Sequence, residues 1–261
     1  MPWFQRYRDF PAYVPVARRR AQAGRRIEEL RRRGIEADPV VIEGRAIART
    51  FWGKAWCDAI EAYSDFANRL PRGRTYARNG SLIHLEIEKG RVSALVSGSS
   101  IYEVEIGIAP AAAKKWKALA RECAGRIDSV VELLTGKLSK AVMALLCRRE
   151  AGLFPSSAEM RLSCSCPDGA RLCKHLAAVL YGVGARLDSR PELLFVLRGV
   201  DQADLVAEAG RGSTLVAPAS APNALSGDLS EIFGIDLGSA PPLPSEIANG
   251  LPRSARRRRR S

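Results

Sequence analysis

Histidine is rare in this sequence, with two in 261 residues, and long apolar runs are missing. No run approaches the about 20 residues that a membrane-spanning helix needs. The first residues, MPWFQRYRDFPAYVP, lack the apolar stretch of a secretory signal, so we expect a chain that stays in the reducing cytoplasm. The six cysteines are therefore predicted to be thiols or metal ligands rather than disulfides.

Sequence motifs for catalysis are also absent. No G-x-x-x-x-G-K-[ST] loop occurs, which excludes a P-loop ATPase motor. With only His84 and His175 available, no serine–histidine–aspartate triad is visible. His84 alternates with polar residues in a predicted strand and has no cysteine nearby, so we interpret it as a strand-face residue rather than a ligand. We therefore expect that the protein is not an enzyme.

Positive charge is abundant, and it lies at the two ends of the chain. The formal net charge is +13. Residues 1–50 hold twelve arginines against six acids, and residues 253–261 hold six arginines and no acid. Extended basic arms suit a polyanion, because each phosphate that they neutralise releases counterions. A merely solubilising role of these ends is the alternative.

The hydropathy pattern predicts an α+β fold. Residues 51–70 have apolar side chains at three- and four-residue steps, which predicts an amphipathic helix that Pro71 ends. Residues 74–108 alternate between polar and apolar, which predicts three or four antiparallel strands in a small meander or open barrel with flanking helices.

Three cysteines and one histidine lie within the thirteen residues SCSCPDGARLCKH, numbered 163–175. Their pattern is C-x-C-x6-C-x-H, and three thiolates with one imidazole are a standard ligand set for structural zinc. The PDG turn brings the chain back, so that the last two ligands enter the first turn of a helix in a β-turn-α finger. We predict one zinc ion bound by Cys164, Cys166, Cys173 and His175.

This predicted zinc is structural rather than catalytic. A catalytic zinc keeps an open position beside three protein ligands, whereas this site offers four ligands and no adjacent glutamate. Loss of a ligand is expected to loosen residues 160–187. The other cysteines, Cys57, Cys123 and Cys147, stand alone in helical segments and are predicted to pack in the core.

Composition divides the chain into four expected parts. A basic N-terminal segment (1–50) precedes an α+β domain of helix, antiparallel strands and helices (51–152). The zinc finger follows with two helices, at about 174–187 and 191–209, in a domain that spans 153–210. The remainder, 211–261, is an arginine-rich tail that is expected to be disordered, because it is rich in Ala, Ser, Pro and Gly.

The stretch CSCPDGARLCKHLAAVLYGVG resembles the SWIM zinc finger. The resemblance implies zinc ligation by the same four residues and a DNA-binding or protein-interaction role. The segments FWGKAWCDAIE, RLPRGRTYARNGSLIHLEIEKGRVSALVSGS and LFPSSAEMRLSCSCPD are similar to bacterial stand-alone SWIM proteins, over about residues 50–185. Such proteins are often associated with Snf-type helicases, so the resemblance implies a helicase partner.

Two basic segments are candidate nucleic-acid contacts. RLPRGRTYARNG (69–80) is expected to be a loop and strand edge, in which arginines hold phosphates and the tyrosine stacks on a base. RSARRRRRS (253–261) suits a non-specific arm. The candidate residues are Arg69, Arg72, Arg74, Tyr76, Arg78, Arg256, Arg257, Arg258, Arg259 and Arg260.

We therefore expect a zinc-binding accessory protein that binds nucleic acid, DNA in the first place, and assists a Snf-type helicase. The alternative is a finger that binds a protein and makes no direct nucleic-acid contact. The helix of the finger favours this alternative, because Ala177, Ala178 and Gly182 make a smooth uncharged face. Neither a membrane nor a small-molecule substrate is expected.

Overall fold

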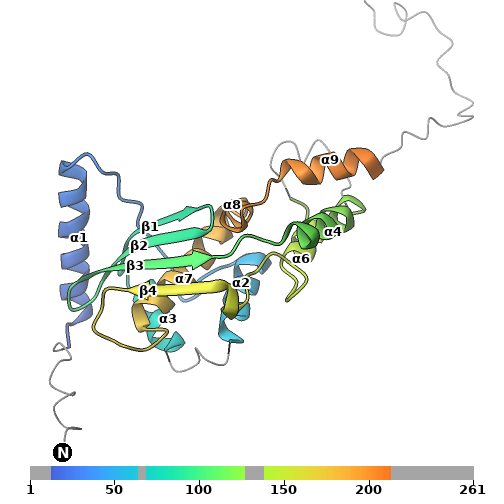
Figure 1. Cartoon of the computed structure of the whole chain (residues 1–261). Helices are drawn as coiled ribbons and strands as arrows, with labels where there is room; N and C mark the ends of the chain where they lie inside the picture. The colour runs from blue at the N-terminus through green and yellow to red at the C-terminus, as the bar shows by residue number, and fades with distance from the viewer. Residues whose placement is uncertain (1–12, 64–68, 127–137, 213–261) are drawn as a thin grey trace, which may run out of the picture. The chain divides into compact units, whose positions relative to one another are not determined.

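A four-stranded antiparallel sheet forms the centre of the computed structural model (Figure 1). The strands follow one another in chain order: β1 (Leu82–Glu88), β2 (Arg91–Ser97), β3 (Ile101–Ile108) and β4 (Met160–Cys164). The predicted α+β class with an antiparallel meander is confirmed, and the sheet is open.

The structure describes residues 13–63, 69–126 and 138–212. The chain divides into two compact units, 1–214 and 215–261, and every described residue belongs to the first. The expected tail begins inside a described helix and from residue 213 onward lies outside the described residues. None of the described helices combines the length and apolar character that crossing a membrane requires.

The strands form because apolar residues alternate along them. In β2 and β3 the buried positions recur every second residue, so one face of the sheet is apolar and faces the core. These core residues are Val92, Ala94, Val96, Tyr102, Val104, Ile106 and Ile108. Gly90 makes the short turn between β1 and β2 with a φ of 71°, a conformation that suits glycine.

The fourth strand comes from the predicted finger rather than from residues 74–108. β4 pairs with β3 from Ile108 opposite Met160 to Val104 opposite Cys164. The finger and the preceding strands therefore share one sheet. The expected boundary between residues 152 and 153 falls inside the compact unit.

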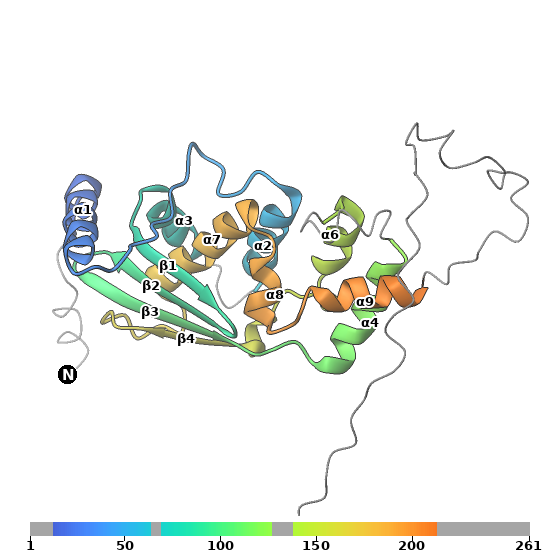
Figure 2. The ribbon, with the colours of Figure 1, turned by 90° about the horizontal axis from the view of Figure 1, so that it is seen from above.

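One face of the sheet is covered by a layer of helices (Figure 2). The central one is α7 (Lys174–Ser189), which packs against all four strands and also against α2 (Phe51–Glu61) and α3 (Leu70–Arg78). Because α7 lies between the sheet and these helices, eleven of its sixteen residues are buried. The helix of the finger is therefore the centre of the hydrophobic core.

The prediction that Pro71 ends a helix is wrong. The helix predicted over 51–70 is described only as far as Glu61, and Pro71 stands in the first turn of α3. Proline fits there because the first turn needs no amide donors. Residues 74–78 are therefore helical, and the predicted loop and strand edge of RLPRGRTYARNG is wrong as well.

The other face of the sheet is covered in part by α1 (Val16–Arg32), where Ala23 and Leu30 pack with Ile83. Beyond the end of the sheet lie α4 (Ala113–Ala124), α6 (Lys140–Leu146) and α9 (Ala203–Gly212) (Figure 1). The helix expected over 191–209 is two helices, α8 (Leu193–Arg198) and α9. Gly199 separates them because its φ of 63° ends α8 in the left-handed conformation.

Candidate metal centre

The chain between β4 and α7 folds back on itself to form the site. At the end of β4, the amide of Ser165 donates to the carbonyl of Glu103 (3.0 Å), which keeps the chain against β3. The carboxylate of Asp168 accepts from the amide of Ala170 (3.3 Å), as expected for turn chemistry at PDG. Cys173 then caps α7, because its sulfur accepts from the amide of Leu176 (3.5 Å).

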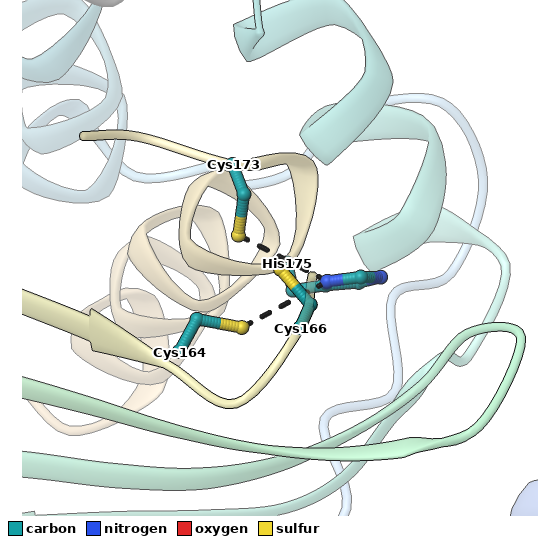
Figure 3. Close-up of side chains that lie close together, drawn as sticks. All are labelled: Cys164, Cys166, Cys173 and His175. Atoms are coloured by element: carbon teal, nitrogen blue, oxygen red, sulfur yellow. Dashed lines mark hydrogen bonds between the residues drawn. The ribbon is translucent and has the colours of Figure 1, made fainter. Parts of the chain in front are cut away.

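Four potential metal ligands converge at this point: Cys164, Cys166, Cys173 and His175 (Figure 3). Their ligand atoms all lie within 4.8 Å of one another, and His175 Nδ1 is 3.9 Å from the sulfurs of both Cys164 and Cys173. Sulfur ligands in a tetrahedral zinc site, with bonds of about 2.3 Å, lie roughly 3.8 Å apart. The donor set and its spacing therefore fit one zinc ion with no open coordination position.

The three thiols of the site differ in their pKa values. Cys164 shares a hydrogen bond with Cys173, which lowers the pKa of Cys173 to about 3, helped by His175 and the amide of Leu176. The same hydrogen bond raises the pKa of Cys164, and burial raises the pKa of Cys166. Cys173 is therefore the thiol that loses its proton most readily, and thiols that ligate a metal release their protons.

Two tyrosines hold the imidazole of His175 in place. The Tyr102 ring lies 4.4 Å from it in a tilted stack, and the Tyr76 ring meets it edge-on at 5.4 Å between centroids. His175 is 2% exposed as a residue, and its Nε2 is buried without a hydrogen-bond partner in the structure. The ring orientation thus depends on packing rather than on the hydrogen bond that usually fixes a histidine ligand.

Gly98 gives the imidazole its space. A Cβ at this position would lie 2.7 Å from His175 Nε2 and 2.8 Å from the Tyr102 ring. We expect Gly98→Ala to reduce zinc affinity about 10- to 100-fold, because displaced support of a ligand has that effect on metal sites. Competition with a chromophoric chelator measures this affinity.

Gly107→Ala is the matched control for Gly98→Ala. A Cβ at Gly107 would have its nearest neighbour at 3.6 Å, an ordinary contact. This variant should keep the zinc affinity of the wild type. Equal affinities of the two variants would mean that the site tolerates a shift of the imidazole.

The candidate nucleic-acid contacts in the segment 69–80 lie on and beside α3. Several of them contact other parts of the protein instead of facing solvent freely. Arg69 pairs with Asp168 of the finger loop (3.4 Å), and Arg74 pairs with Glu61. Tyr76 is half-buried against His175 instead of standing free. Arg72 is exposed, and it has no ion-pair partner among the described residues. The arginines of 256–260 lie outside the described residues.

Sequence reasoning missed Tyr102 and Gly98, and it gave Tyr76 a different role. No local signal marks these residues, because they reach His175 only through the pairing of strands and the packing of α3 on α7. The expectation that the small residues of the finger helix form an exposed face is wrong. Ala177 and Ala178 are fully buried, and Gly182 packs on β1. Small residues occur there because α3 and the sheet approach α7 closely.

The remaining cysteines and His84 are placed as predicted. Cys57 and Cys123 are buried and Cys147 packs at the edge of the core. Burial raises the pKa of Cys57 and Cys147 to about 12, and that of Cys123 to about 11, so these thiols stay protonated. His84 is a strand-face residue of β1 whose Nδ1 accepts from the amide of Asp38 (3.0 Å).

Comparisons with known proteins agree with this geometry. Residues 150–183 match the family model of the SWIM zinc finger. The uncharacterized protein Rv2102 of Mycobacterium tuberculosis is 37% identical over 165 residues, which cover 62% of this chain and 59% of that protein. The chain thus spans less than two thirds of the length of this relative. No solved structure matches the chain.

Proposed function

Because residues 150–183 form a SWIM zinc finger with a complete Cys3His ligand set, we propose that the chain is a zinc-dependent accessory protein that binds nucleic acid. DNA is the first candidate, and a Snf-type helicase is the proposed partner in its work. The zinc holds the finger in shape, and basic helices beside the finger contact the phosphate backbone.

The observation that carries this proposal is the meeting of two basic helices next to the metal centre. Residues 16–27 of α1 include five arginines and no acid, and α3 includes three arginines and no acid. The two helices touch where Arg20 Nε donates to the carbonyl of Asn79 (3.0 Å). Arg26 pairs with Glu29 and Arg74 pairs with Glu61, but the other arginines of the two helices leave a net positive charge that attracts a polyanion.

Exposed cations of this surface are available to a ligand. Arg18 on α1 and Arg72 on α3 are exposed and have no ion-pair partner in the part of the chain that the structure describes. Arginine presents a planar fork of donors that matches two phosphate oxygens. Contacts of this kind position a nucleic acid without reading its sequence.

We also propose that the finger does no catalysis and that the chain works in a reducing compartment such as the cytoplasm. A zinc ion with four protein ligands has no position for a reacting water. All six cysteines are free thiols in the structure, three of them in the zinc site. Thiolate ligands stay reduced in such a compartment.

Salt and the C-terminal arginines test nucleic-acid binding. Anisotropy with random single- and double-stranded oligonucleotides at about 50 and 200 mM salt should show an affinity that falls steeply as salt rises. Removal of residues 253–261 takes away six arginines. We expect it to weaken binding and to reduce the salt slope by up to about 5, since each contact contributes about 0.9. An unchanged salt slope would mean that residues 253–261 do not contact the nucleic acid.

The second candidate function is docking of a protein partner without nucleic-acid contact. The feature that favours it is the part of the sheet that α1 leaves open, where a hollow of about 440 Å³ lies between Ser93, Glu103, Glu105 and Ser163. The wild-type protein would then show no salt-sensitive binding of oligonucleotides. A helicase complex that persists at high salt would favour this candidate.

A further inference from the structure

Arg19 of α1 is a buried cation without a counter-charge. Its side chain is part of a residue that is 4% exposed, and its Nε and Nη1 atoms are buried with no hydrogen-bond partner. The guanidinium contacts Tyr76, with Cζ 4.1 Å from the ring centroid, but no carboxylate pairs with it among the described residues. Arginine does not give up its proton in proteins, and an unpaired buried charge is costly. This position therefore favours an anion.

A second cation lies near the same ring, and a third lies on the same flank of α3. Lys174 Nζ lies 5.9 Å from the Tyr76 centroid. Arg72 precedes Tyr76 by four residues on α3, so both lie on one flank of that helix. We call Arg19, Arg72, Tyr76 and Lys174 the Tyr76 cluster. Its cations come from three separate elements, α1, α3 and the start of α7.

An acidic residue of the finger loop is already paired with another arginine of this flank. Asp168 of the finger loop pairs with Arg69, which lies one turn before Arg72 on the same flank. The finger loop therefore neutralises the first arginine of the flank and leaves the Tyr76 cluster positive. Cations that gather on one ring repel each other, and an anion between them removes this repulsion.

We infer that the Tyr76 cluster is a phosphate-binding site at the junction of α1, α3 and the zinc finger. Arg19 and Arg72 supply guanidinium donors that pair with phosphate oxygens, and Lys174 adds a point charge. The inference rests on the proposed function for the source of the phosphate, which is the backbone of a nucleic acid. A free phosphate has the same chemistry and is tested separately.

The zinc ion is coupled to this site through two contacts. Lys174 stands between the ligands Cys173 and His175 in the sequence, and Tyr76 packs edge-on against the His175 ring. Loss of zinc releases Cys173 and His175 from coordination and so weakens the support of their neighbours in the cluster, Lys174 and Tyr76. Phosphate binding therefore depends on the metal, although the metal itself does not touch the phosphate.

Arg19→Met tests the site, because it removes the charge and keeps much of the side-chain length. We expect oligonucleotide affinity to fall about 10-fold or more, the effect of losing hydrogen bonds to a charged group. Arg25→Met is the matched control on the same helix, since Arg25 is exposed and unpaired among the described residues. It should cost about twofold, as for a single screened surface charge. Zinc content is measured for every variant.

Inorganic phosphate provides a second, independent readout. At constant ionic strength, about 10 mM phosphate should raise the melting temperature of the wild type, because a ligand stabilises the state that binds it. Arg19→Met should abolish this shift, and it should leave the melting temperature in phosphate-free buffer unchanged or higher, since it removes an unpaired buried charge.

The outcomes separate the two proposals. If the wild type binds oligonucleotides but Arg19→Met and Arg25→Met behave alike, the phosphate site is wrong and nucleic-acid binding stands. If the wild type binds no oligonucleotide, the proposed function fails, and the phosphate-dependent shift alone decides the site. If Arg19→Met lowers the melting temperature and no phosphate shift exists in the wild type, Arg19 is a structural residue and the inference is overturned.

Discussion

Removal of the zinc will free residues 165–173 and leave the sheet and most of α7 folded. The metal is the cross-link between the end of β4 and the start of α7, so the loop between them depends on it most. We expect the free energy of unfolding to fall by about 4 kcal/mol or more, the stabilisation by a ligand held at about 1,000 times its Kd. A fall of this size lowers the melting temperature by about 10 °C in a chain of this length.

The remainder of α7 should stay folded because other contacts hold it. Its eleven buried residues include aliphatic side chains, each of which stabilises the fold by about 1.5 to 3 kcal/mol. The indoles of Trp56 and Trp52 donate to the carbonyls of Leu180 and Leu187, both at 2.9 Å. An isolated zinc-finger peptide has no such support and unfolds without its metal. The effect should therefore be narrower than the loosening over 160–187 that the sequence predicts.

Hydrogen exchange with and without a chelator measures this effect, and two serine substitutions separate metal loss from thiol loss. Cys173→Ser should lose the zinc and increase exchange in residues 165–173. Cys147→Ser replaces a half-buried thiol outside the cluster and should keep one zinc per chain. Faster exchange throughout β1, β2 and β3 after chelation would show that the metal holds the whole fold.

Replacing Gly73 with alanine will destabilise the protein by about 2 to 3 kcal/mol, the upper part of the range for overpacking. A Cβ at this position would lie 2.3 Å from the Cβ of Ala177 and 2.7 Å from its backbone carbonyl carbon. Backbone atoms cannot rotate away as a flexible side chain can, so α3 must separate from α7. The helix that carries Arg72 and Tyr76 would move with it.

Gly24→Ala on α1 is the control for this substitution. Gly24 lies in a helix, and an added Cβ would meet nothing within 4 Å. Alanine should therefore stabilise the protein by about 0.5 to 1 kcal/mol, because it costs less backbone entropy than glycine in a helix. Urea unfolding of both variants measures the difference. Similar stability of the two variants would contradict close packing of α3 on α7.

The finger could be predicted from the sequence because its determinants are local. Four ligands, a PDG turn and the start of a helix all lie between residues 163 and 175, so residue types and spacing are enough. The alternation of β2 and β3 is equally local. Its consequence, a meander with a glycine turn, agrees with the structure.

The parts that could not be predicted depend on long-range packing. Proline lacks an amide donor, so Pro71 is typical of a helix end. The same property permits proline in the first turn of a new helix, and the packing of α3 on α7 decides between the two. The sequence predicts an exposed face for Ala177 and Ala178, because it does not show which sides of α7 are covered by other elements. In the same way, the contact of Tyr76 with His175 joins residues 99 positions apart.

The burial of α7 on nearly all sides limits how this finger can be transferred to another protein. A fragment of residues 150–183 would carry all four ligands, but it would leave behind the tryptophans of α2 and the strands that cover the apolar side chains of α7. Such a fragment would expose those side chains and aggregate, even with zinc bound. Transplantation into another protein would therefore succeed only together with β1, β2, β3 and the helices that enclose α7.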